Sequence, residues 1–410
     1  MPRLPISDGK ARWARPLLLV FALLLAWSSI TQAGSMVFHV RNPSLALWFD
    51  ADDPVALVRA AEARLAVRSN EDNAGARAVG AARRSIAQNP LNADAFGLYG
   101  LVRLANSDLS VIGRQMAMAD RLSRRDLGTQ LFLIEDSVRR NDVAEALEHY
   151  DTAMRVSDSI RPTLYPILTE AMREPAIRKR FLPYMDASTP WLEPFLRYAI
   201  SNSSEPASIV ALAVEAGGFP EGPQFATRVP ELLSVVVGQE DYDTARRLYE
   251  VVGGGDPATL RDVRFTEATT ETSLAPFTWQ PFQMGDVDSL FIAGADSRLE
   301  LEARMSAGVS AGIMRRLLAL PPGTYAMAFP MQSEGHDPAD TAQMQIACVS
   351  QGGRNVIADA RRDLASEFVL GREFTVPRGC AYQMVTLSVS TRATPGEIVL
   401  TIDSPGLGTR

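Results

Sequence analysis

NDVAEALEHYDTAMRV, residues 141–156, is the stretch from which the helical fold of the first half of the chain is predicted. It places Ala146, Tyr150 and Ala153 at spacings of four and three residues, so all three lie on one face of an α-helix. Two helix backbones approach closely only where the side chain at their crossing is small, so the two alanines are predicted packing residues. The Asn-Asp pair at the start is a turn signal, and the stretch therefore predicts the second helix of a helix pair.

The same arrangement occurs 34 residues earlier, where Ala119 corresponds to Ala153 and Met116 to Tyr150. This period and this alternation of small and large residues resemble the tetratricopeptide repeat family, in which each repeat is one helix pair. Further residues that fit the pattern are Ala78, Ala82, Ser85 and Pro90 upstream, and Ala245 and Tyr249 downstream.

The resemblance covers residues 78–156 and returns at residues 235–252, whereas the prolines between residues 160 and 230 predict short or kinked helices. It implies a curved stack of helices whose concave face holds a peptide or a helix, and it implies no chemistry. The residues that we expect on this partner-binding face are Leu101, Leu104, Leu131 and Val138. The alternative is an array that only positions another domain.

The N-terminal forty residues indicate a membrane segment. Basic residues precede LLLVFALLLAW, and residues 17–40 contain no Asp, Glu, Lys or Arg, which is long enough for a helix to cross a bilayer. The basic flank predicts a cytoplasmic N-terminus and a translocated bulk, as in a single-pass protein of a bacterial inner membrane that faces the periplasm. A signal peptide cleaved after Thr31-Gln32-Ala33 is the alternative.

The hydrophobic period changes from 3.6 to 2 after residue 273. Before this change, VGGGDPATLRDVRFTEATTETS, residues 252–273, is rich in glycine and threonine and predicts an interdomain linker over residues 253–273. After it, SRLELEARMSAG alternates strictly, and several apolar runs bounded by Pro-Gly and Gly-Gly turns follow. The C-terminal part is therefore predicted to be an antiparallel β-sandwich.

The run LALPPGTYAMAF, residues 318–329, with PFTWQPF before it and FTVPRGC beyond it, resembles carbohydrate-binding jelly-roll domains. The resemblance implies that Trp279 and Tyr325 are aromatic platforms on which a sugar stacks. The alternative is that both rings belong to the core of the sandwich.

The chain contains two cysteines, Cys348 and Cys380, and an oxidising compartment permits them to form a disulfide. A net charge of −7 argues against a nucleic-acid partner. The sequence has no nucleophile elbow, phosphate-binding loop or zinc-protease motif, and His336 lies in an acidic loop whose spacing matches no known metal site. We therefore expect no enzyme activity, no catalytic or metal-ligating residues and no cofactor.

The sequence predicts a multi-domain protein with both α and β parts. Residues 1–40 form a cytoplasmic stub and membrane anchor, residues 41–252 a tetratricopeptide-like solenoid, residues 253–273 a linker and residues 274–410 a β-sandwich. The predicted function is that of a membrane-anchored envelope scaffold which recruits protein partners through its helices. The alternatives are a polysaccharide-binding accessory of envelope glycan assembly or export and, third, a hydrolase in the sandwich.

Overall fold

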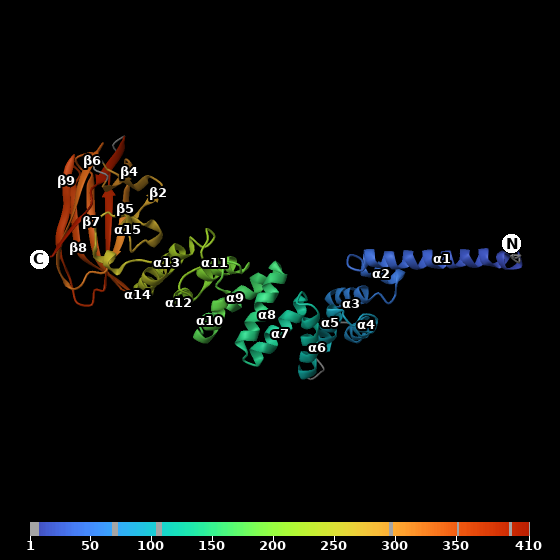
Figure 1. Ribbon diagram of the computed structural model, residues 1–410. Coiled ribbons are helices and arrows are strands. Elements are labelled where there is room, and N and C mark those ends of the chain that lie inside the picture. Colours follow the sequence, from blue (N-terminus) through green and yellow to red (C-terminus); the bar gives the residue numbers. More distant parts are fainter. Residues whose placement is uncertain are drawn as a thin grey trace, which may run out of the picture. The chain divides into compact units, whose positions relative to one another are not determined.

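The computed structural model describes residues 8–67, 73–103, 109–294, 298–350, 352–392 and 396–409. Helices come first along the chain and strands last, as Figure 1 shows. The chain forms two compact units, residues 1–164 and 165–410. The predicted fold class is confirmed: an apolar N-terminal helix, a series of helices and an antiparallel β-sandwich.

The first unit is helical. Its elements are α1 (Asp8–Phe38), α2 (Pro43–Phe49), α3 (Pro54–Val67), α4 (Ala74–Gln88), α5 (Ala93–Arg103), α6 (Leu109–Leu122), α7 (Leu127–Arg139) and α8 (Val143–Val156). Helices α3 and α4, α5 and α6, and α7 and α8 pack as consecutive pairs. The pairing agrees with the helix–turn–helix units expected from the sequence.

The residues that predicted the repeat are packing residues. Ala119 on α6 and Ala153 on α8 are both fully buried, and Met116 and Tyr150 are buried beside them on the same helices. A side chain larger than alanine has no room at these positions because the core is close-packed. The predicted packing role of the alanines is confirmed.

Two helix pairs share one turn geometry. Asn141 precedes α8 with a φ of 59°, and Glu240 precedes α14 (Tyr242–Arg247) with the same φ of 59°. An aspartate follows each of them and caps the next helix: Asp142 accepts from the backbone N–H of Glu145, and Asp241 accepts from that of Thr244. The pair around residue 240 therefore repeats the local structure of the α7–α8 pair.

The second unit begins with short helices, as the prolines predicted. These are α9 (Arg161–Ala171, which begins just before the division between units), α10 (Pro175–Phe181), α11 (Leu192–Asn202), α12 (Pro206–Ala216), α13 (Arg228–Gly238) and α14. Pro175 and Pro206 occupy the first turns of their helices, where the missing N–H costs nothing.

Two antiparallel sheets form the β-sandwich. The strands are β1 (Gln280–Pro281), β2 (Gln283–Met284), β3 (Val287–Ala293), β4 (Leu299–Ser306), β5 (Ser310–Leu318), β6 (Gly323–Glu334), β7 (Thr341–Ser350), β8 (Gly353–Asp363), β9 (Glu367–Val376), β10 (Tyr382–Ser390), β11 (Glu397–Ile402) and β12 (Gly406–Thr409). The first sheet has the order β1-β5-β10-β7-β8. The second has the order β12-β6-β11-β4-β3-β2, with β9 also paired to β6. Alternate residues of both sheets meet in one apolar core.

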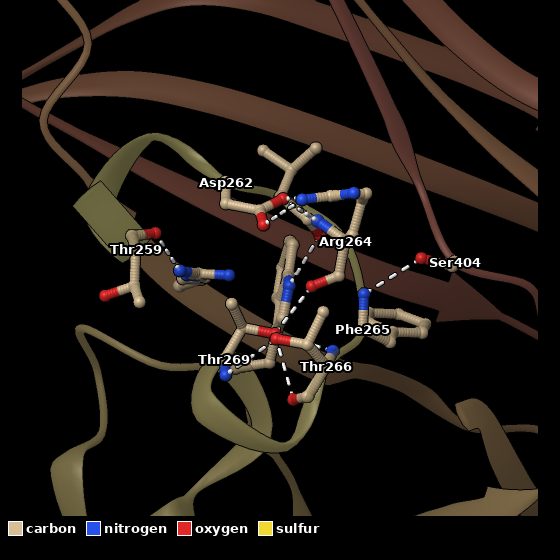
Figure 2. Close-up of polar contacts among 10 residues, drawn as sticks. Thr259, Asp262, Arg264, Phe265, Thr266, Thr269 and Ser404 are labelled. Carbon is tan, nitrogen blue, oxygen red and sulfur yellow. Dashed lines mark hydrogen bonds and ion pairs between the residues drawn. The ribbon is translucent and has the colours of Figure 1, made fainter. Parts of the chain in front are cut away.

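The segment expected to be a linker is instead part of the sandwich. Residues 253–273 contain a 3₁₀ turn (Pro257–Arg261) and the short helix α15 (Glu267–Thr270). Val263 and Phe265 lie between these elements and are buried in the sandwich core. The Phe265 N–H donates to the hydroxyl of Ser404, 2.9 Å away on the C-terminal segment (Figure 2). The linker prediction is wrong because glycine and threonine content reports local flexibility and does not report burial by distant strands.

A fully buried arginine fastens this segment to β5. The guanidinium of Arg316 donates to the carbonyl of Thr259 at 2.5 Å and to that of Phe277 at 3.1 Å. Thr259 and the Thr266–Thr269 turn of the same segment are labelled in Figure 2. Burial lowers the pKa of Arg316 to about 10, so the group stays charged at neutral pH. The segment is therefore held by hydrogen bonds to a charged donor as well as by apolar contacts.

Candidate functional site

The two predicted sugar-stacking residues lie in the core. Trp279 is 0% exposed, meets Phe265 and Phe329 edge to face, and donates its Nε1–H to the carbonyl of Val263 at 2.9 Å. Tyr325 is 6% exposed, with its hydroxyl bonded to the carbonyl of Pro321 at 2.9 Å. Neither ring offers a free face to a ligand, so the glycan-binding assignment of both residues is wrong and the core alternative holds.

The outward surface of the first sheet carries polar side chains in register across four strands. One row consists of Arg315 on β5, Thr386 on β10, Gln345 on β7 and Asp359 on β8. Each residue of the row lies directly opposite the next. The next outward row is formed by Gly312, Ser388, Gln343 and Arg361. We call these two rows the polar face.

Hydrogen bonds within the polar face, and from it to the flanking residues Arg354 and Gln280, orient its side chains. The Gln343 amide donates to both carboxylate oxygens of Asp359, at 2.8 and 2.9 Å. Arg354 donates to the amide oxygen of Gln345 at 2.9 Å, while Arg315 donates to that of Gln280 at 2.7 Å. These planar amide, carboxylate and guanidinium groups present both donors and acceptors in fixed positions.

An aromatic ring borders the polar face. The ring of Phe282, which follows β1, lies against Gly312, where an added Cβ would come within 2.9 Å of it. The guanidinium of Arg315 lies 5.5 Å from the centre of the same ring. Phe282 is half-buried, and burial lowers the pKa of Arg315. Ring and guanidinium together form a partly desolvated edge next to hydrogen-bonding groups.

Helix α14 covers the other end of this sheet surface. Tyr382 packs on Tyr242 with ring centres 5.7 Å apart, and its hydroxyl donates to Asp243 at 2.7 Å. Burial, together with the hydrogen bond to Asp243, raises the pKa of Tyr382. The neighbouring outward residues Leu317 and Met384 are buried as well. Among the described residues of this sheet surface, those of the polar face therefore remain open to a ligand.

The helical unit brings two of the predicted partner-binding residues together. Leu101 of α5 and Leu131 of α7 line a pocket of about 350 Å³, with Phe132 beside them and Glu135, Asp136 and Arg139 also in its lining. Leu101 is 37% exposed. Val138 is 56% exposed on α7 but does not line this pocket. Leu104 lies outside the described residues.

The predicted disulfide is present. Cys348 of β7 and Cys380, just before β10, are bonded with Cα atoms 5.5 Å apart. The bond lies in the first sheet, two residues before Tyr382, and so ties down the end of the sheet that α14 covers.

The acidic loop around His336 performs a structural role. The buried Asp340 accepts hydrogen bonds from the backbone N–H groups of Asp337 and Arg392, both at 2.7 Å, and His336 contacts the hydroxyl of Ser333 at 3.0 Å. Among the described residues, no group of three histidine, cysteine or acidic side chains is arranged to hold a metal ion.

Strand β8 was missed by the sequence reasoning, and it supplies Asp359 and Arg361 to the polar face. A weak alternation of period two marks this strand, because Ala358 and Ala360 face the core and alternate with the exposed Asp359 and Arg361. Because alanine is small and weakly apolar, its alternation with charged residues gives little contrast.

One helix of the first unit is apolar and long enough to cross a membrane. The segment Pro16–Phe38 meets these criteria, and both a membrane anchor and a signal sequence fit such a helix.

No protein-family model and no curated protein matches the chain. Solved structures of carbohydrate-binding modules are similar to the C-terminal β-sandwich. A family 4 module shows 16% identity over 32% of this chain and 94% of its own, with a TM-score of 0.24. A family 61 module in complex with β-1,4-galactotriose shows 17% identity, and the match covers 37% of this chain and 99% of the module, with a TM-score of 0.25. A family 16 module shows 16% identity, and the match covers 35% of this chain and 97% of the module, with a TM-score of 0.26. At this level the likeness concerns the fold of the sandwich.

Proposed function

We propose that this protein is a membrane-anchored, non-enzymatic component of the cell envelope that binds a polysaccharide on the polar face of its β-sandwich. The observation that carries the proposal is the open polar face itself. Gln343 is bonded to Asp359, Gln345 is bonded to Arg354, and the ring of Phe282 borders the face at Gly312. Oriented amide and carboxylate groups suit sugar hydroxyls, and a half-buried ring suits the apolar face of a pyranose. The sequence favoured a scaffold for protein partners over a polysaccharide-binding protein. We propose the opposite preference.

Binding without turnover is part of the proposal. Strands β1, β5, β7, β8 and β10 place two carboxylates on this surface, Asp359 and Asp363, and both belong to β8. Four residues along a strand separate them by about 13 Å, whereas glycosidases need two carboxyl groups about 5–9.5 Å apart. The pair is too widely spaced for the general acid and base of such a reaction.

The test is glycan binding by the full-length chain purified in detergent, screened against a panel of bacterial envelope polysaccharides. Asp359→Ala and Gln345→Ala are each expected to weaken binding about tenfold, since each removes a hydrogen-bonding group and leaves its neighbour unpaired. Glu302→Ala and Arg304→Ala are matched controls, because these residues form a similar polar pair on β4 of the other sheet, 2.8 Å apart. Equal loss in the controls, or binding to no glycan in the panel, refutes the proposal.

A second proposed function is the capture of a protein partner by the helical unit, for which the pocket of Leu101 and Leu131 is the supporting observation. A groove with an apolar floor and a charged rim suits an amphipathic helix. In-cell crosslinking with mass spectrometry is expected to lose its protein crosslinks in Leu101→Glu. Val156→Glu is the control, since Val156 is also 37% exposed but lies outside the pocket. Retention of crosslinks in both variants contradicts this second function.

The anchor is proposed from the packing at the base of α1. A Cβ on Gly34 would lie 2.8 Å from the ring of Phe49, and the hydroxyl of Ser35 donates to Asp53 at 2.5 Å. The end of the apolar helix is thus packed against α2 and the start of α3. We propose that α1 stays attached and spans the inner membrane, with the bulk of the chain in the periplasm.

A further inference from the structure

A groove in the helical unit lies at the base of the apolar helix. It has a volume of about 730 Å³ and is formed by α2, α3 and α4. Its floor is apolar, with Leu47 from α2, Leu57 and Ala61 from α3, and Ala78 and Ala81 from α4. Neither the polar face nor the pocket of Leu101 shares any residue with it.

Arginines provide the charge of this groove. Arg64 of α3 and Arg77 and Arg84 of α4 are all exposed, and the described lining contains no carboxylate. Arg84 lies 3.9 Å from Asp52 across a surface where both side chains are more than half exposed. An exposed pair of that length contributes little and leaves the guanidinium able to turn toward a ligand. An apolar floor beneath several arginines fits an amphiphile with an acidic head.

The groove is connected to the membrane segment by a short path. Helix α2 begins five residues after α1 ends, and its Phe49 packs on Phe38 with ring centres 6.1 Å apart. Trp48, next to the groove residue Leu47, is 75% exposed. An exposed tryptophan beside a transmembrane helix is typical of the membrane interface, where lipid head groups lie. Figure 1 shows α1 leaving the packed helices at this point.

We propose that this groove binds an acidic phospholipid of the membrane in which α1 is anchored. The head group lies among Arg64, Arg77 and Arg84, and the upper acyl chain contacts Leu47 and the alanines of the floor. The inference rests on the proposed anchor, because only an attached α1 keeps the groove at the head-group level. The bound lipid then fixes the helical unit against the bilayer surface.

The test uses the full-length chain purified in mild detergent with equal amounts of phosphatidylglycerol and phosphatidylcholine. Lipids that remain bound are counted by native mass spectrometry. We expect preferential retention of phosphatidylglycerol by the wild type. We expect the preference to fall about fivefold for each arginine removed in Arg64→Gln, Arg77→Gln and Arg84→Gln.

A control with the same change of charge separates the groove from general attraction to the membrane. Arg59→Gln, Arg124→Gln and Arg155→Gln remove three exposed arginines of the same unit that lie outside the groove. This triple variant is expected to keep the preference. Ala63→Phe fills the groove from an exposed position without changing any charge, and it is expected to lose the preference.

Three results overturn the proposal. These are equal retention of the two lipids by the wild type, an equal loss in the control triple variant, and an unchanged preference in Ala63→Phe. Recovery of an acidic peptide in place of the lipid overturns it as well. Failure of the anchor has a different signature, since the protein then leaves the membrane fraction altogether.

Discussion

Removal of the disulfide between Cys348 and Cys380 is expected to destabilise the sandwich through the unfolded chain. The bond joins residues 32 apart in sequence. In the chain-entropy model, a loop of this length lowers the entropy of the unfolded state enough to contribute about 3.7 kcal/mol to the free energy of unfolding. Cys348→Ala with Cys380→Ala is therefore expected to lose about this amount while native contacts such as Tyr382 to Asp243 remain.

Hydrogen exchange followed by mass spectrometry measures the loss of local stability on peptides from β7 and β10. Protection in these strands is expected to fall about 500-fold, which is the equilibrium equivalent of the lost free energy. Wild-type protein in reducing agent is the matched control and should reach the same protection as the double variant. Protection that is unchanged in both, or a loss in the variant that reduction does not reproduce, refutes the reasoning.

The remaining predictions concern packing, capping, titration and the anchor. Ala153→Leu is expected to destabilise the helical unit by about 1–3 kcal/mol through overpacking, while Glu148→Ala, on an exposed position, does little; equal melting shifts contradict the repeat assignment. Asp241→Ala removes the cap of α14 and should cost about 1 kcal/mol in urea unfolding, with Asp241→Asn as the control that retains most of it. Because the folded state raises the pKa of Tyr382, it holds the phenol proton more tightly than the unfolded chain. The contribution of Tyr382 to stability should therefore be complete below the ordinary phenol pKa of about 10 and fall as the pH rises above it. The stability of Tyr382→Phe should fall less steeply over this range. Identical pH profiles of stability in the wild type and the variant would contradict this role of Tyr382. The protein should stay in the membrane pellet after alkaline carbonate washing, whereas release with a new N-terminus near Gly34 would identify a signal peptide.

The placement of the candidate site could not be read from local pattern. Trp279 stands in a stretch that resembles a sugar-binding segment, yet its ring is buried because Val263 and Phe265 of the preceding segment and Phe329 of β6 converge on it. Asp359 belongs to a strand whose inward residues include Ala358 and Ala360, so the alternation of apolar and polar residues along this strand has little contrast. The residues of the polar face come from strands β5, β7, β8 and β10, and only strand pairing brings them together.

Local patterns in the sequence were enough to predict the helical and β parts of the fold, although they missed strand β8. The spacing of Ala146, Tyr150 and Ala153 specifies a helix packed through a small residue, and alternation of period two specifies the strands of the sandwich, because both patterns follow from the backbone repeat. The pairing of the two cysteines was predicted from their number together with the oxidising compartment expected for this part of the chain. The tertiary structure was needed to show that residues 253–273 belong to the sandwich and that α14 covers one end of a sheet surface. Burial of a segment depends on which distant surfaces meet it, and no local pattern contains that information.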